Sequence, residues 1–281
     1  MKERMTDARP IYWSPHGGVA RDWAPQRLFD VVAGAGYAGT EIWMDRRWLD
    51  WSDPADVARI RADARRRNLE TPVVCWRRVP GLEPTDPAHA IDATRYLEAC
   101  IRVGAACGAD TVLCYPGVPD GVPYRDAWST CRDVLAALGP ACRDAGIDIA
   151  IEFESPGPVL LGTPLETLRF IAETGDHVSA CADTYHLHNR GIDQGEGVRQ
   201  LKGHLRLAHL SDSERRTPGE GTVDFPSFFA GLRDVRFDGR LFVQCGPASV
   251  AEIGTALDRA RAWAAVLGAS AAGSGEGDAA D

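Results

Sequence analysis

Short apolar runs alternate with longer amphipathic segments along almost the whole chain. Runs such as TVLC at 111–114 and IAIE at 149–152 are typical of buried parallel strands, and segments of helical periodicity separate them. We expect eight strands, at 10–14, 39–43, 70–76, 111–115, 148–153, 178–183, 205–210 and 241–245. The helical segments lie near 24–35, 53–68, 87–107, 124–145, 163–174, 193–202, 225–235 and 249–267.

This strict alternation predicts an α/β fold, a single (β/α)8 barrel. A closed barrel of parallel strands fits eight such units better than an open doubly wound sheet does. Asp53-Pro54 and Asp86-Pro87 each place a capping side chain just before a helix-compatible proline, which supports two of the expected helix starts. No GxGxxG motif follows the first strand, and this disfavours a dinucleotide-binding fold.

The barrel is expected to occupy residues 10–268 as one catalytic domain. Residues 1–9 form a short N-terminal leader. The last segment, 269–281, reads ASAAGSGEGDAAD and offers almost nothing to bury, so we expect a disordered tail.

Charge and cysteine content narrow the classes of partner. The formal net charge is -9 and the chain has no basic run, which argues against binding to nucleic acid or to an anionic membrane surface. No apolar stretch approaches the roughly 20 residues of a membrane span, and the polar start predicts a cytoplasmic protein. The eight cysteines include no CxxC pair, so we expect buried free thiols.

Polar residues end four successive expected strands, where barrel enzymes carry their active sites. Each of these residues alone is more commonly a rim or structural residue, but a packed barrel interior does not hold four unpaired polar groups without a reason. Carboxylate, imidazole and amide groups are suitable ligands for Mn, Mg, Co or Zn. The four are Glu152, Asp183, His209 and Gln244.

The motifs around these positions resemble those of the sugar phosphate isomerase/epimerase family of xylose isomerase-like barrels. The similar segments are GYAGTEIW at 36–43, IAIE, ADTYH at 182–186, LAHLSD at 207–212 and RRTPGEGTVDF at 215–225. The resemblance implies that Glu152, Asp183 and His209 bind one divalent metal together with a residue on strand eight. It further implies that His186 and Arg215 contact the substrate, and that the protein forms a homodimer or homotetramer.

Gln244 departs from this pattern, because the family usually has Glu on strand eight. The amide oxygen of Gln still coordinates metals, but Gln carries no proton at neutral pH and lowers the ligand charge from -3 to -2. Glu154 faces the same way as Glu152 and is an alternative carboxylate.

The resemblance implies proton transfer next to a carbonyl, with the metal stabilising the developing negative charge. Epimerases of this kind place one carboxylate on each face of the substrate, and Gln244 breaks that pair. Glu152 remains as a single base, and His186 is a candidate acid or orienting group. We therefore expect a metal-dependent isomerase or lyase acting on a small, sugar-like polyhydroxylated compound.

Aromatic residues and His16 lie at the ends of the first three expected strands. Trp13, Trp43 and Trp76 suit packing against a sugar ring, although tryptophans in barrels are as often plain core. Glu41 falls inside strand two and is expected to bond within the barrel.

Three other functions remain open at this stage. Gln244 favours a metal-free barrel enzyme performing acid–base or cyclisation chemistry on a less polar substrate. A non-catalytic small-molecule binding barrel is a further alternative. A DNA-repair endonuclease shares the fold, but the acidic charge and the lack of further metal ligands disfavour it. No Gly-rich loop marks a phosphorylated substrate.

Overall fold

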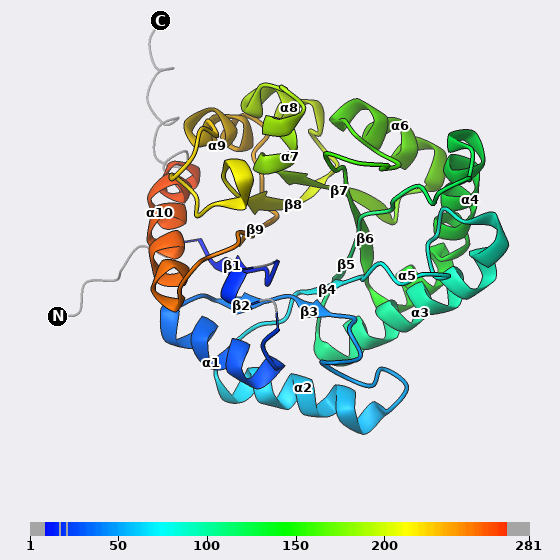
Figure 1. Cartoon of the computed structure of the whole chain (residues 1–281), viewed down its shortest axis with the longest axis horizontal. Helices are drawn as coiled ribbons and strands as arrows, with labels where there is room; N and C mark the ends of the chain where they lie inside the picture. The colour runs from blue at the N-terminus through cyan, green and yellow to red at the C-terminus, as the bar shows by residue number, and fades with distance from the viewer. Residues whose placement is uncertain (1–8, 17, 21, 269–281) are drawn as a thin grey trace, which may run out of the picture.

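The computed structural model describes residues 9–16, 18–20 and 22–268, and within them the chain forms a (β/α)8 barrel (Figure 1). The expected tail and nearly all of the expected leader lie outside these residues. All strand pairs are parallel. The strand segments are β1 (Ile11–Trp13), β2 (Gly39–Thr40), β3 (Ile42–Trp43), β4 (Val73–Cys75), β5 (Thr111–Cys114), β6 (Asp148–Glu152), β7 (Val178–Asp183), β8 (Leu205–Leu210) and β9 (Arg240–Val243).

The barrel closes through Glu41. The strands are ordered β2-β1-β9-β8-β7-β6-β5-β4-β3, so the sheet begins and ends with two segments that only Glu41 separates in the chain. β2 pairs with β1, and β3 pairs with β4. The expected strand at 39–43 is therefore one barrel strand in two pieces, and the (β/α)8 prediction is confirmed.

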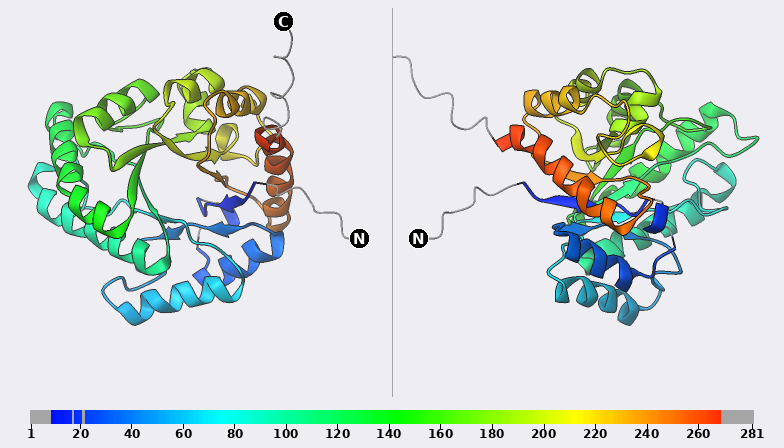
Figure 2. Two further views of the ribbon diagram at one scale, coloured as in Figure 1. Left: turned by 180° about the vertical axis from the view of Figure 1, so that it is seen from behind. Right: turned by 60° about the vertical axis from the view of Figure 1, so that its left-hand side comes forward.

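The helices form an outer ring around the strands, as the views from behind and from the side show (Figure 2). Their apolar faces pack on the barrel, and helix α1, for example, buries Leu28, Phe29 and Val32. The helices are α1 (Pro25–Ala35), α2 (Pro54–Arg66), α3 (Ala90–Cys107), α4 (Tyr124–Ala137), α5 (Gly139–Ala145), α6 (Pro164–Thr174), α7 (Thr184–Asn189), α8 (Gln194–Gln200), α9 (Phe225–Asp234) and α10 (Val250–Gly268). Short 3-10 turns are η1 (Gly18–Ala20), η2 (Pro87–His89) and η3 (Ser213–Arg215).

The helices differ from the sequence expectation at two places in the chain. The expected single helix at 124–145 is two helices, α4 and α5, which meet at Leu138. Pro140 lies in the first turn of α5, where its missing N–H costs nothing, whereas inside a continuous helix it would remove a hydrogen bond. Helix α7 was not expected, and it begins directly after Asp183, whose side chain accepts a hydrogen bond from the Tyr185 N–H.

The expected capping residues do what their types predict. The side chains of Asp53 and Asp86 accept hydrogen bonds from Ala55 and Ala88, at the starts of α2 and η2. All eight cysteines are buried and free, as expected. None of the helices in the described part of the chain combines the length and apolarity that crossing a bilayer requires.

Candidate active site

Four barrel strands bring their polar residues to one end of the barrel. Glu152 and Asp183 are the last residues of β6 and β7, His209 lies one residue before the end of β8, and Gln244 directly follows β9. Asp183 is the register partner of His209 across β7 and β8. Each of the four side chains is at most 5% exposed. The structure therefore places all four residues at the C-terminal mouth of the barrel.

His209 lies between two buried carboxylates. Its Nδ1 is 3.0 Å from Oε1 of Glu152, and its Nε2 is 3.3 Å from Oε1 of Glu41. Burial alone would lower the pKa of His209, but Cys181 and Glu152 beside the ring raise it well above its ordinary value. Burial likewise opposes ionisation of Glu152, yet the charge and hydrogen bond of His209 hold the pKa of Glu152 at about 2. Glu152 is thus a carboxylate at neutral pH.

The guanidinium of Arg215 joins three of the expected site residues. One nitrogen, Nη1, donates to Oδ2 of Asp183 and, over 2.9 Å, to Oε1 of Gln244. The other, Nη2, lies 2.8 Å from Nε2 of His186. The guanidinium also stacks on Tyr185, with 4.1 Å between its carbon and the ring centre. η3 carries Arg215 over the mouth with a positive φ of 58°.

Both ring nitrogens of His186 contact hydrogen-bonding groups. Arginine only donates, so a hydrogen bond with Arg215 requires a free lone pair on Nε2 of His186. Nδ1 lies 3.0 Å from the Ser155 carbonyl, but it also accepts a hydrogen bond from the Ser155 N–H over 2.9 Å, which requires a free lone pair on Nδ1 as well. Burial lowers the pKa of His186 and keeps the ring neutral. A neutral ring has only one unprotonated nitrogen, so these two contacts belong to different tautomers, and His186 stays a candidate acid or orienting group.

Hydrogen bonds also fix the orientation of the Gln244 amide. Its Nε2 donates to Oγ of Ser14 over 3.2 Å, and Ser14 in turn donates to Oε2 of Glu41 over 2.7 Å. The amide oxygen therefore points at Arg215 and the other polar groups. Ser14 escaped the sequence analysis because a lone serine after a strand carries no spacing signal.

The donor set fits a divalent cation. Glu152, Asp183 and His186 offer ligand atoms within 4.8 Å of one another, as do Glu152, Cys181 and His209. A cationic group, the Arg215 guanidinium, already lies between Asp183 and Gln244. Glu152 belongs to both groups, whereas Asp183 and His209 belong to one each. A metal ion held by Glu152, Asp183, His209 and Gln244 would draw the two groups together and displace Arg215, because both cations cannot bind the same oxygens.

The donor set opens into a cavity of about 440 Å³, within the range of roughly 300–1,000 Å³ that is usual for small-molecule sites. Of the expected aromatic residues, Trp43 lines this cavity together with His16. Trp13 and Trp76 are fully buried and pack on Tyr37 and Tyr115 instead. Trp43 is therefore the one tryptophan of the three that can contact a molecule bound in the cavity. The lining residues are His16, Asp22, Trp43, Arg47, Cys75, Arg77, Arg78, Tyr115, Glu152, Glu154, Arg215 and Gln244.

Glu154, the alternative carboxylate, lies in the wall of the cavity. It forms an ion pair with Arg78 instead of joining the four donors. Burial raises its pKa to about 7, against the opposing effect of Arg78. The Glu154 carboxylate is therefore paired with Arg78 and is not one of the four candidate metal ligands.

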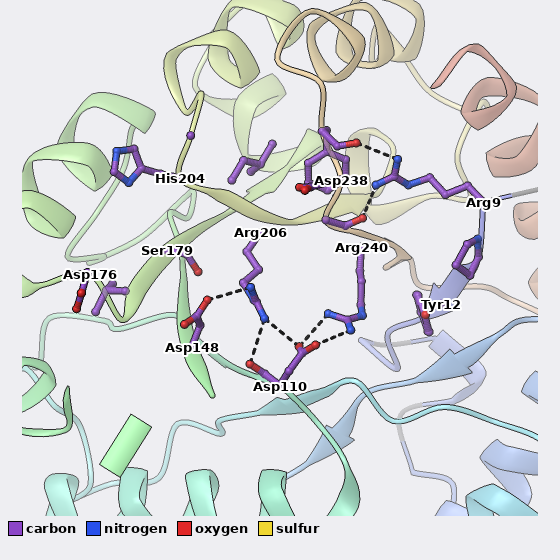
Figure 3. Close-up of a pocket in the computed structure, with 16 residues that line it drawn as sticks. Arg9, Tyr12, Asp110, Asp148, Asp176, Ser179, His204, Arg206, Asp238 and Arg240 are labelled. Atoms are coloured by element: carbon purple, nitrogen blue, oxygen red, sulfur yellow. Dashed lines mark hydrogen bonds and ion pairs between the residues drawn. The ribbon is translucent and has the colours of Figure 1, made fainter. Parts of the chain in front are cut away.

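A larger cavity, of about 810 Å³, opens at the other end of the barrel, where the strands begin (Figure 3). Two arginines of this cavity form ion pairs with two of its aspartates. Arg240 makes two hydrogen bonds to Asp110, of 2.8 and 2.6 Å, and Arg206 pairs with Asp110 and Asp148 at 3.3 and 3.0 Å. The N-terminal face of such barrels serves stability, and this closed network fits that role.

Comparisons with known proteins agree with this geometry. A family model described as xylose isomerase-like TIM barrel matches residues 29–265. The L-ribulose 3-epimerase of Mesorhizobium japonicum is 28% identical over 201 residues, 67% of each chain. The L-ribulose 3-epimerase of a Methylomonas species is 26% identical over 226 residues, 78% of each chain. A solved D-psicose 3-epimerase from Clostridium cellulolyticum H10 superposes with a TM-score of 0.79 at 14% identity, over 91% of this chain and 99% of that one.

Proposed function

Because the chain belongs to the family of xylose isomerase-like TIM barrels, we propose that it is a metal-dependent isomerase or epimerase of a small sugar. The reaction would move a proton on a carbon next to a carbonyl group. The observation that carries this proposal is that Glu152, Asp183, His209 and Gln244 lie at the C-terminal ends of four neighbouring strands, with Glu152 in both groups of potential metal ligands. The relatives named above are epimerases, and none of them is a lyase, so we no longer propose a dehydration.

The residues of this chain divide the work between them. Glu152 is an ionised carboxylate that faces the cavity, so it is the base that accepts the proton. Arg215, which lies 2.8 Å from His186 without metal, would donate N–H groups to substrate oxygens once a bound cation displaces it from Asp183 and Gln244. A divalent cation bound at the donor set supplies Lewis-acid stabilisation of the negative charge that develops on a carbonyl oxygen.

Gln244 favours isomerisation over inversion at one carbon. An epimerase that inverts a carbon removes the proton from one face and returns it to the other, which takes two acid–base groups. Gln244 cannot carry a proton, so it cannot serve as the second group. Glu152 therefore takes up and returns the proton on one face, as in the interconversion of an aldose and a ketose.

Exchange with solvent deuterium tests the proposal. The purified protein, loaded with Mn²⁺, is incubated in D₂O with D-fructose, D-psicose, D-tagatose or L-ribulose, and the sugars are followed by NMR. We expect deuterium on a carbon next to the carbonyl, and we expect Glu152→Gln to slow its appearance at least about 100-fold. A surface control, Glu196→Gln, should match the wild type. Exchange that survives in Glu152→Gln would remove Glu152 from the mechanism, and the product, an aldose or a 3-epimer, separates the two reactions.

A metal-free reaction is the second candidate, and the contacts of Arg215 favour it. Its guanidinium already supplies a positive charge to Asp183 and lies beside Gln244, where it can stabilise a developing oxyanion. Deuterium exchange that persists after exhaustive treatment with EDTA, and that disappears in Arg215→Gln, would favour this candidate over the first.

A further inference from the structure

Four arginines line the mouth cavity, and one of them has no acceptor. Against three carboxylates in the same lining, the arginines give the cavity an excess of positive charge, although the whole chain carries a net charge of -9. Three of the arginines are committed to protein groups. Arg47 pairs with Asp22 and Asp45, Arg78 binds Glu154 and the Tyr115 carbonyl, and Arg215 binds Asp183, Gln244 and His186.

Arg77 is the exception. Its guanidinium stacks on the ring of Trp43, with 4.3 Å from its carbon to the ring centre, and its side chain is half-buried. Among the described residues, no carboxylate forms an ion pair with Arg77 and no group accepts a hydrogen bond from its guanidinium. Stacking holds the guanidinium plane in place and leaves five N–H donors free at its edge. A fixed guanidinium with free donors is suited to binding a carboxylate or a phosphate.

Arg77 lies across the mouth from the donor set. It follows β4 by two residues, and in the closed order of the barrel β4 stands opposite β8, which carries His209. Cys75 and Tyr115 line the cavity on the same side as Arg77. A sugar that is bound at the donor set and spans the mouth toward β4 would bring its other end to Arg77 and Trp43.

We propose that Arg77, stacked on Trp43, is a subsite for an anionic group at the end of the substrate remote from the reacting carbon. The substrate class is then an acidic sugar, a keto sugar bearing a carboxylate or a phosphate, and not a neutral ketose. This inference rests on the proposed function only in placing the reacting carbon at Glu152. The partnerless guanidinium stands independently of which reaction occurs.

Anion binding tests the subsite without any need for turnover. Inorganic phosphate and glycolate are titrated by calorimetry, at low ionic strength, into the wild type, Arg77→Gln and Arg46→Gln. Arg46 is a matched control, since it also stacks on a tryptophan, Trp51, at 4.4 Å, but it is 69% exposed and lies outside the mouth cavity. We expect one of the two anions to bind the wild type, Arg77→Gln to weaken that binding about tenfold, and Arg46→Gln to leave it unchanged. Glycolate against phosphate distinguishes the two anion chemistries.

Two results would overturn the subsite. One is a wild type that binds neither anion, and the other is an Arg77→Gln variant that binds as tightly as the wild type. Circular dichroism and thermal melting of Arg77→Gln establish that any loss is not unfolding.

Turnover then separates the subsite from the proposed reaction. D-fructose is compared with D-fructose 6-phosphate and D-fructuronate in the deuterium-exchange assay. We expect a lower KM for one of the anionic sugars, and we expect Arg77→Gln to remove that preference while sparing kcat. Anion binding that depends on Arg77 without exchange on any sugar would leave the subsite standing and contradict the reaction. Exchange with the same KM for neutral and anionic sugars would support the reaction and contradict the subsite.

Discussion

The amide oxygen of Gln244 lies 2.9 Å from the Arg215 guanidinium, while its amide nitrogen donates to Ser14 on the other side. Ser14 has one proton, and it gives that proton to Glu41. Only a residue that donates on one side and accepts on the other satisfies both neighbours, and glutamine does so. The amide at this position is thus matched to its surroundings.

Gln244→Glu should strengthen metal binding and weaken the metal-free fold. A carboxylate adds a charge to the donor set, which should raise the affinity for Mn²⁺ by about tenfold or more. Without metal, Ser14 would face two carboxylates with one proton, so the melting temperature should fall. Thermal melting with and without Mn²⁺ measures both effects. Gln244→Met, which removes the oxygen, should bind Mn²⁺ more weakly than the wild type, and equal affinities in all three proteins would contradict a ligand at this position.

The carboxylate of Glu41 lies beside the ring of His209, on the side away from Glu152. Its Oε1 is 3.3 Å from Nε2 of His209, and a carboxylate behind a metal-binding histidine typically contributes 10- to 100-fold to metal affinity. We therefore expect Glu41→Gln to weaken Mn²⁺ binding by at least about tenfold, as calorimetry would measure. Glu70→Gln is a control at the other end of the barrel, where Glu70 accepts a hydrogen bond from Tyr12. An unchanged Mn²⁺ affinity in Glu41→Gln would show that Glu41 does not contribute to metal binding.

Gly39 allows the second strand to approach its neighbour. A Cβ atom at this position would collide with the backbone carbonyl of Glu70, which belongs to the segment leading into β4. Gly39→Ala should therefore lower the free energy of unfolding by about 1–3 kcal/mol, measurable by urea denaturation. Gly34→Ala is the comparison, because a Cβ at position 34 in helix α1 meets no atom within 4 Å. Equal stability of the two variants would show that the strands separate at little cost.

The ion pair of Asp110 makes the stability of the fold depend on pH. Burial opposes its ionisation, but two hydrogen bonds from Arg240 hold the pKa of Asp110 below its ordinary value. A lowered pKa in the folded state means that the ion pair stabilises the fold above pH about 4 and is lost as the pH falls through the folded pKa. Asp110→Asn should cost about 1 kcal/mol at pH 7, a value reduced by solvent screening.

The pH profile of unfolding checks this prediction. The stability difference between the wild type and Asp110→Asn should shrink toward zero below pH about 4. A difference that is constant with pH would mean that the network contributes by packing and not by charge.

Two features could be predicted from the sequence: the repeating strand–helix units of the barrel and the polar residues that recur at strand ends. Alternation of apolar runs and helices predicts the barrel, and Glu152, Asp183 and His209 stand out because polar residues interrupt buried strands. The Ser14–Glu41 link was not predictable, since its two residues, 27 positions apart, meet only when β1 and β2 pair. Arg77 was missed for a related reason. A surface arginine is unremarkable in sequence, and its lack of an acceptor is visible only when every neighbour is placed.

Equilibrium dialysis against Mn²⁺, followed by elemental analysis, tests the cation site most directly. The wild type is compared with the double variant Asp183→Ala plus His209→Ala, whose fold is checked by circular dichroism. We expect the wild type to retain about one equivalent of metal and the double variant to retain none. A wild type that retains no metal, or equal retention by both proteins, would show that these residues do not bind a metal ion. The Arg215 guanidinium would then be the cation at this site.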